Sequence, residues 1–108
     1  MASVTLDGAA IRDEASFHAA SRAAFGLPDY YGDTMDSWID ALSYLRDDEG
    51  MTNIRLKPSE LLQIVIDNTA ALRAAAPDLL AEIEYCVGGI NERYEDYGEK
   101  PALQLVLR

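Results

Sequence analysis

The sequence has few of the residues on which small proteins build disulfides or catalytic sites. Its 108 residues include one cysteine, Cys86, and one histidine, His18. A single cysteine excludes an internal disulfide and favours a reducing compartment. A single histidine with no nucleophile or acid beside it in a motif gives no catalytic signature. We therefore expect His18 to be structural and Cys86 to be a small buried hydrophobe.

Long apolar runs and basic residues are also scarce. No run approaches the roughly 18 apolar residues of a membrane span, and the opening "MASVTLDG" lacks the pattern of a signal peptide, so we expect a cytoplasmic protein. Nine Lys and Arg residues stand against nineteen Asp and Glu residues, a net charge of −10. This charge disfavours nucleic acid and anionic membranes and favours basic partners, although it is also compatible with a role in solubility alone.

The remaining pattern predicts one α/β domain over residues 1–108. Strands are expected at 3–6, 61–68 and 102–107. The first helix is expected between Asp13, which caps its start, and Gly26, which ends it. The second is expected from 35 to about 46, with Thr34 as its N-cap. Two more are expected at 69–75 and from Pro77 to about 97. Strands separated by helices predict a three-stranded parallel sheet with right-handed crossovers, packed with about four helices.

Three details of this organisation carry further expectations. The apolar run "LLQIVIDN" suits a strand that is buried on both faces of a parallel sheet. Residues 47–60 form a polar excursion with Gly50 and Pro58, and a short extended piece is expected at 53–56. The pair Gly88-Gly89 costs stability within the last helix, and close packing against a neighbour would explain it.

One segment, "LPDYYGDTMDSWIDAL", concentrates acids without any basic residue. Its four aspartates are Asp29, Asp33, Asp36 and Asp40. On a helical wheel the apolar side chains of 35–46 gather on one side, and Asp36, Asp40, Ser43 and Asp47 gather on the other. Asp36 lies in the first turn, where an acid complements the helix dipole. Asp40 lies one turn further, where it repels Asp36.

Three interpretations of these acids remain open at this point. The acids can be ordinary solvated residues. They can bind a metal, although the spacing fails the calcium-loop pattern because Tyr31 and Gly32 occupy the wrong positions. They can also form a protein-binding face, because Tyr30 and Tyr31 flank them and tyrosine beside carboxylates suits a basic cleft. In that case we expect one of the two tyrosines to be buried and the other exposed.

The segment resembles the signature of the barstar family, which comprises intracellular inhibitors of secreted ribonucleases such as barnase. The Leu-Pro-acid-Tyr-Tyr-Gly motif carries the resemblance, which continues backward through "VTLDGAAIRDEASFHAASRAAFG". It covers residues 3–45 closely and returns more loosely from Leu62 to the end. The resemblance implies the family's three-stranded parallel sheet packed with helices, which agrees with the order of elements predicted above.

The resemblance also implies roles for individual residues. Tyr30 would pack against the catalytic histidine of the ribonuclease, and Gly32 would allow close backbone approach. Asp36 would meet basic residues at the mouth of the active site, and Asp40 would be the central carboxylate. Further matched positions are Thr34, which replaces an asparagine, Ser43, which replaces a threonine, and Glu92, the best match to a carboxylate on the last long helix.

Several positions depart from the family pattern. Ile39 and Leu45 stand where the family has tryptophans, and Trp38 falls one place early, which should direct it into the core. Despite these departures, the resemblance implies a non-enzymatic inhibitor of a basic ribonuclease, with no cofactor or metal. The alternatives are a regulatory or scaffold module that binds another basic protein, and a small metal-dependent enzyme that uses the aspartates.

Overall fold

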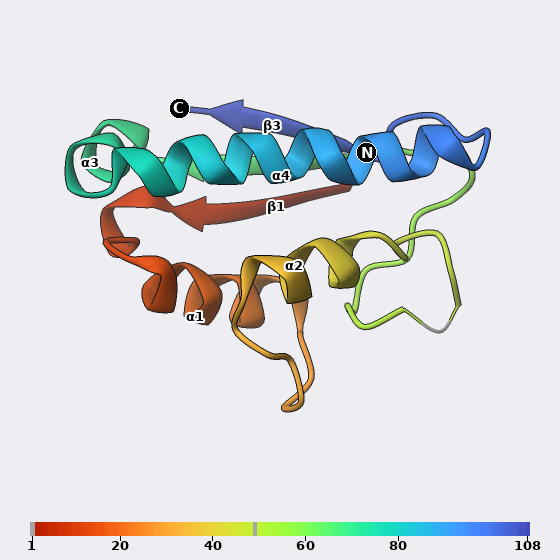
Figure 1. The fold of residues 1–108 in the computed structure, drawn as a ribbon, viewed down its shortest axis with the longest axis horizontal. Coiled ribbons are helices and arrows are strands. Elements are labelled where there is room, and N and C mark those ends of the chain that lie inside the picture. Colours follow the sequence, from red (N-terminus) through yellow and green to blue (C-terminus); the bar gives the residue numbers. More distant parts are fainter. Residues whose placement is uncertain (1, 49) are drawn as a thin grey trace.

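The computed structural model describes residues 2–48 and 50–108 and shows a sheet with helices packed on it (Figure 1). The strands are β1 (Ala2–Asp7), β2 (Leu62–Asp67) and β3 (Leu103–Leu107). The helices are α1 (Glu14–Phe25), α2 (Met35–Leu42), α3 (Thr69–Ala75) and α4 (Pro77–Asp96), with a short 3-10 turn, η1 (Gly8–Ala10), after β1. The predicted α/β class and order of elements are confirmed.

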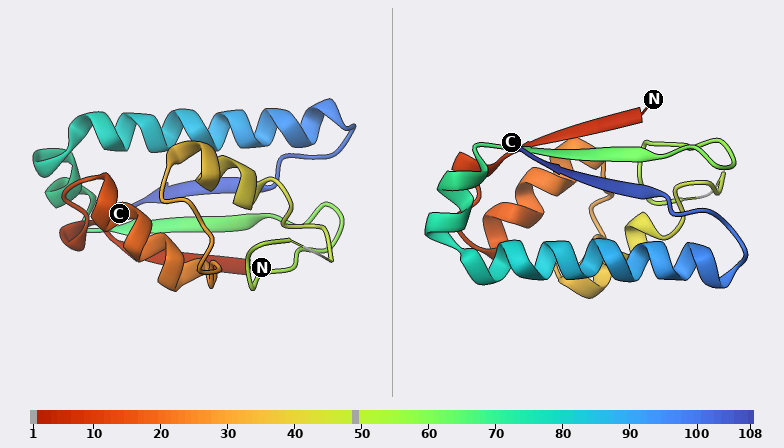
Figure 2. Two further views of the ribbon diagram at one scale, coloured as in Figure 1. Left: turned by 60° about the horizontal axis from the view of Figure 1, so that its bottom comes forward. Right: turned by 90° about the horizontal axis from the view of Figure 1, so that it is seen from above.

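The three strands form one parallel sheet in the order β1-β2-β3. Residues 2–7 pair with 62–67, and residues 62–66 pair with 103–107, each without a bulge. Two successive right-handed crossovers that step in the same direction place their helices on the same face of the sheet. Figure 2 shows this arrangement, with α1, α2 and α4 on one side of the strands. None of the helices in the described ranges is long and apolar enough to cross a membrane.

The sheet is therefore covered on one face only, and the prediction that residues 61–68 are buried on both faces is wrong. Leu62, Ile64 and Ile66 point to the helices and are buried. Gln63 and Asp67, on the opposite face, are only half-buried. Val65 is buried on that face because it lies in register between two neighbours, Thr5 on β1 and Val106 on β3. The apolar run reflects a central strand in a two-layer fold.

Local caps fix the start of α1 and of α2 and the end of α1. The Asp13 carboxylate accepts a hydrogen bond from the Ser16 amide, and the Thr34 hydroxyl accepts one from the Ser37 amide. Gly26 ends α1 in the left-handed conformation, with φ of 63°. All three predicted caps are confirmed.

The predicted end of α2 is wrong, because the helix stops at Leu42 instead of continuing to Arg46. The Tyr94 hydroxyl of α4 accepts a hydrogen bond from the Leu45 amide at 2.9 Å and donates one to the Leu42 carbonyl at 2.9 Å. These bonds satisfy groups that a longer helix would have paired internally. A side chain some fifty residues away in the sequence therefore determines where α2 ends.

The excursion at 47–60, of which residue 49 lies outside the described residues, contains no strand in its described part. The extended piece predicted at 53–56 does not join the sheet. Backbone hydrogen bonds attach this segment to the helical layer instead: the Asn53 amide donates to the Phe25 carbonyl at 2.9 Å, and the Leu56 amide donates to the Leu45 carbonyl at 2.8 Å. Leu56 is buried, so the excursion covers one end of the core.

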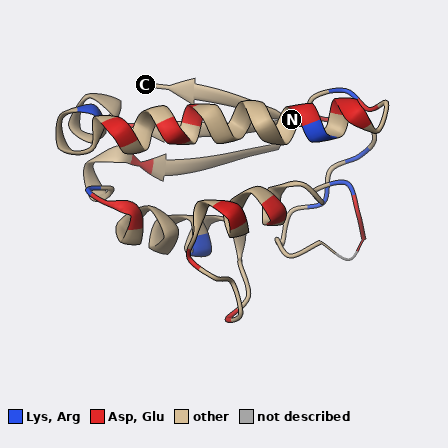
Figure 3. Cartoon of the chain, in the orientation of Figure 1, with Lys and Arg blue, Asp and Glu red and all other residues tan. Residues whose placement is uncertain are grey.

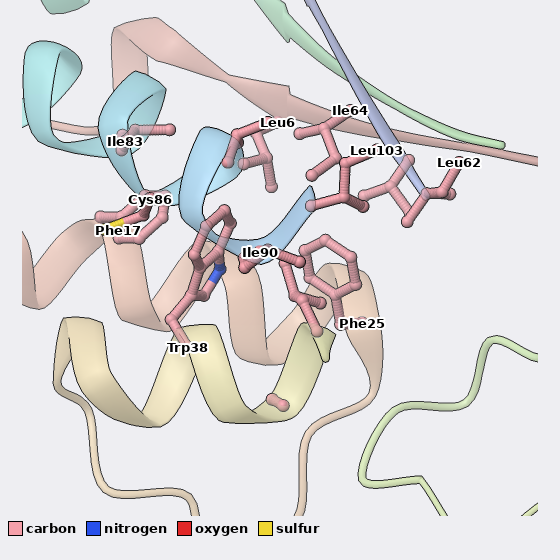
Figure 4. Close-up of a cluster of buried hydrophobic side chains, with 14 of the residues drawn as sticks. Leu6, Phe17, Phe25, Trp38, Leu62, Ile64, Ile83, Cys86, Ile90 and Leu103 are labelled. Atoms are coloured by element: carbon pink, nitrogen blue, oxygen red, sulfur yellow. The ribbon is translucent and has the colours of Figure 1, made fainter. Parts of the chain in front are cut away.

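The core lies between the sheet and the three larger helices (Figure 4). Phe17 and Phe25 of α1 and Trp38 of α2 are fully buried in it. The Phe17 and Trp38 rings lie 5.4 Å apart between centroids in a tilted arrangement. Cys86 of α4 is also buried, as expected, and burial is the main cause that raises the pKa of its thiol.

The two glycines in α4 are not explained by close packing, contrary to the expectation from the sequence. A Cβ built on Gly88 or Gly89 would meet no heavy atom within 4 Å outside its own helical neighbourhood. Both positions therefore have room for a side chain, and each glycine lowers the stability of the helix without a compensating contact.

We predict that Gly88→Ala raises the free energy of unfolding by about 0.5–1 kcal/mol, because alanine restricts the unfolded chain and favours helix. Chemical denaturation followed by circular dichroism measures the change. Gly26→Ala is the matched control and should destabilise, since φ is positive there and the new Cβ would lie 2.6 Å from the Asn53 side chain. Destabilisation by Gly88→Ala would show that this face of α4 is packed.

Candidate protein-binding surface

The acidic segment forms an exposed surface made of the loop 27–34 and the outward side of α2. Trp38, Ala41 and Leu42 are buried against the rest of the protein. Asp36 and Asp40 are exposed on the opposite side of the helix. Figure 3 shows the two acids in red on α2, a helix that carries no Lys or Arg. We call this region, from Leu27 to Ser43, the acidic surface.

Of the two adjacent tyrosines in the loop, one is buried and the other is exposed, as expected from the sequence. Tyr31 is 3% exposed, and its hydroxyl lies 2.7 Å from Nδ1 of the buried His18 in a hydrogen bond. The other ring nitrogen of His18 lies 3.2 Å from the Glu14 carboxylate. Burial, reinforced by the nearby Asp33 carboxylate, raises the pKa of Tyr31. Tyr30 is 77% exposed and projects from a loop that its neighbour holds in place.

An arginine from α1 also braces the loop, which the sequence reasoning missed. The Arg22 guanidinium pairs with the Asp33 carboxylate and donates a hydrogen bond of 3.3 Å to the Tyr31 carbonyl. It also lies over the Tyr31 ring, 5.8 Å from the centroid. Asp33 has a φ of 52°, in the left-handed region, which aspartate tolerates better than most residues. Asp33 therefore shapes the loop from within.

A second arginine, from α4, meets Asp40. Nη1 of Arg93 lies 3.1 Å from Oδ1 of Asp40 and 3.2 Å from Oγ of Ser43. This pair brings Asp40 and Ser43 together, but around a cation that the sequence reasoning did not include. The available signal was the position of Arg93 three residues after Ile90, on the flank of the apolar stripe of α4.

The remaining candidate residues occupy different parts of the surface. Asp36 makes no ion pair with any residue in the described ranges, and it lies close enough to α4 to contribute to the raised pKa of the Cys86 thiol, after burial and Glu82. Gly32 lies against α2, where an added Cβ would come 2.7 Å from Oγ of Ser37. Glu92 is exposed and lies about 100° around α4 from Arg93, so it does not face Asp40.

The hydroxyl groups of the surface are used internally. Thr34 donates to Oγ of Ser37 at 2.9 Å in addition to capping α2. The Ser43 hydroxyl donates to the Ile39 carbonyl at 2.6 Å, which leaves its lone pairs for Arg93. A groove of about 650 Å³ continues from Ser43 and Arg93 between the C-terminal ends of α2 and α4. Tyr44 and Tyr97, both exposed, are among the residues that line it.

The aspartates do not converge on one point. In the part of the chain that the structure describes, no group of three or more His, Cys, Asp or Glu side chains is placed to hold a metal ion. Two of the four aspartates are turned toward arginines of the same chain. The arrangement presents separate charges across a surface.

Fold and surface together define a small acidic α/β domain that exposes one face of a short helix. Comparison with protein families matches residues 1–106 to the family described as Barstar (barnase inhibitor). The chain therefore belongs to the Barstar family, as the resemblance of the acidic segment indicates. A comparison with curated proteins gives no significant match.

The anchoring of the loop can be tested on the two adjacent tyrosines. Tyr31→Phe should lower the free energy of unfolding by about 1–2 kcal/mol, because it leaves the buried Nδ1 of His18 without its partner. Tyr30→Phe, the matched control, should change it by less than about 0.5 kcal/mol, since that hydroxyl is exposed. Urea denaturation measures both. Equal effects of the two variants would contradict the assigned anchoring role.

Proposed function

We propose that the protein inhibits a basic secreted ribonuclease, and that it does so from the cytoplasm of the producing cell without catalysis or a cofactor. The acidic surface would cover the active site of the ribonuclease and take the place of the RNA phosphates. One observation carries this proposal: Asp36 and Asp40 share the exposed side of a short helix whose other side is locked in the core, beside the exposed Tyr30. Membership of the Barstar family supports it.

Each part of the surface has a distinct role in this proposal. Tyr30 offers an exposed ring for contact with a side chain of the ribonuclease, since its neighbour already anchors the loop. Gly32 allows the partner's backbone to approach, and Thr34 holds the start of α2. Asp36 and Asp40 meet the cations of the active site. Ser43 and Glu92 lie at the border of the contact.

Electrostatics supports rapid encounter with such a partner. The net charge of −10 creates a negative field around the protein, and cations on the partner's cleft would be attracted along it. Covering the site then replaces solvent around Asp36 and Asp40 with cations of the partner. Steering therefore depends on the whole chain, while specificity depends on the acidic surface.

A second function, as a regulatory or scaffold module that binds another basic protein, is favoured by one observation. Asp40, the central carboxylate of the proposal, is already paired with Arg93 of its own chain. The departure at Ile39 points the same way, because this half-buried side chain of α2 lacks the aromatic ring of the family pattern, whereas Leu45 is fully buried and offers no contact to a partner.

Asp40→Asn provides the decisive functional variant. We predict that the purified protein inhibits RNA cleavage by a barnase-type ribonuclease, and that Asp40→Asn weakens this inhibition by about 2–5 kcal/mol, or roughly thirtyfold to several thousandfold. This range of energies was measured in part on the complex of barnase with barstar, a member of the same family as this protein. The loss arises because a buried cation of the ribonuclease would lose its carboxylate.

The matched control for this variant is Glu84→Gln, which removes the same charge from α4. Glu84 is exposed and lies two positions from the buried Cys86, about 200° around the helix, so it faces away from the core. The Glu84→Gln variant should inhibit the ribonuclease as strongly as the unmodified protein does. If the two variants inhibit equally well, Asp40 is not the central contact. If the unmodified protein does not inhibit at all, binding of another basic protein replaces ribonuclease inhibition as the function.

Ionic strength should act mainly on the association rate. We predict that this rate falls about tenfold between roughly 0.05 and 0.5 M salt, while the dissociation rate changes much less, because the long-range attraction is screened over about 10 Å at 0.1 M. Stopped-flow fluorescence with the ribonuclease measures both rates. An association rate that is insensitive to salt would contradict electrostatic steering while leaving the contact itself intact.

A further inference from the structure

We propose that Arg93 determines which ribonucleases the protein binds, and that the natural partner carries an acidic side chain next to the cation that meets Asp40. This inference rests on the proposed function, because it concerns the partner of the same surface. The carboxylate that should be the centre of the contact already meets a cation, Arg93 of α4.

Both side chains of the Arg93–Asp40 pair are partly exposed and keep hydrogen-bonding groups that the pair does not use. Arg93 is 49% exposed and Asp40 is 61% exposed. Only Nη1 of Arg93 and Oδ1 of Asp40 take part in the ion pair. Within the described ranges, Oδ2 of Asp40 and the Nη2 and Nε groups of Arg93 make no hydrogen bond. A partner can therefore reach Asp40 through Oδ2 while Arg93 keeps its contact with Oδ1.

A second contact holds Arg93 at this position. Oγ of Ser43 donates its hydrogen to the Ile39 carbonyl, so that it can act only as an acceptor toward Nη1 of Arg93. Asp40 of α2 and Ser43, the C-cap residue three positions further along, thus form a two-point acceptor for the guanidinium. Arg93 is an element of the surface that a partner meets and must match.

The consequence for a partner follows from desolvation. An exposed ion pair contributes little to the stability of the free protein because water screens it. Once a partner covers the pair, the remaining donors of Arg93 lose their water and need acceptors, and any cation of the partner that reaches Asp40 comes close to a like charge. A cleft lined only by cations satisfies Asp40 and opposes Arg93. A cleft with a carboxylate beside its cation satisfies both.

Arg93 could instead turn away when a partner binds. The groove beside it is lined by Asp47 and Asp96, which are alternative acceptors for a guanidinium. If that movement were free, the residue at position 93 would have no influence on which partner binds. The two possibilities therefore give different results when the charge at position 93 is changed.

The first experiment measures inhibition constants against a barnase-type ribonuclease for the unmodified protein, Arg93→Gln and Arg93→Glu. We expect inhibition to tighten in that order, with Arg93→Glu at least about tenfold tighter than the unmodified protein. Arg73→Glu on α3 is the matched control, since Arg73 is an exposed arginine on another helix and the variant changes the net charge equally. It should tighten inhibition by less than about threefold.

The second experiment tests the acidic side chain of the partner. The basic residues around the active site of the same ribonuclease are changed to glutamate one at a time. At least one change should make the unmodified protein a tighter inhibitor than it is of the unmodified ribonuclease, and the same change should weaken inhibition by Arg93→Glu. A set in which no change favours the unmodified protein would overturn the proposed partner chemistry.

The outcomes separate this inference from the proposed function. If the unmodified protein inhibits and Arg93→Glu behaves like Arg73→Glu or more weakly, the role of Arg93 is wrong and the inhibitor function stands. If no variant inhibits while each keeps its circular dichroism spectrum and melting temperature, the proposed function fails and the inference fails with it. Both residues of the pair are exposed, so folding should survive the charge changes.

Discussion

Burial of Trp38 sets the rotation of α2, and every proposed property of the acidic surface depends on that rotation. The side chain is fully buried, lies against Phe17, and donates a hydrogen bond from Nε1 to Oγ of Ser21 at 3.2 Å. A helix of eight residues has little stability of its own, so packing must hold it. Once Trp38 is seated, Asp36 and Asp40 can only point outward.

The surface that results is more finely divided than its sequence suggests. Arg22 satisfies Asp33, Arg93 satisfies one oxygen of Asp40, and Tyr31 is buried against His18. These contacts leave Tyr30, Asp36 and Oδ2 of Asp40 for a partner. Negative charge over the whole protein would attract many basic molecules, whereas this arrangement of single groups would select among them.

Local chemistry explains what the sequence could predict. Caps such as Asp13, Thr34 and Gly26 act within a few residues, and the acidic segment is contiguous, so both are visible in the sequence. The errors involve distant residues. The Tyr94 hydroxyl bonds to the end of α2, and Arg93 pairs with Asp40. No helix in the described ranges covers the outer face of β2, because both crossovers pack on the opposite side of the sheet. Apart from the position of Arg93 on the flank of the apolar stripe of α4, these features have no signature in local periodicity or propensity.

The central claim is that the loop 27–34 and the exposed side of α2 bind the active site of a basic ribonuclease. Amide chemical shifts of the ¹⁵N-labelled protein, recorded while a barnase-type ribonuclease is added, test it most directly. The account predicts that the largest changes cluster at residues 29–43 and at Arg93, with little change on the outer face of the sheet around Thr5 and Val106. Changes centred on the sheet or on α3, with the acidic surface unaffected, would contradict it.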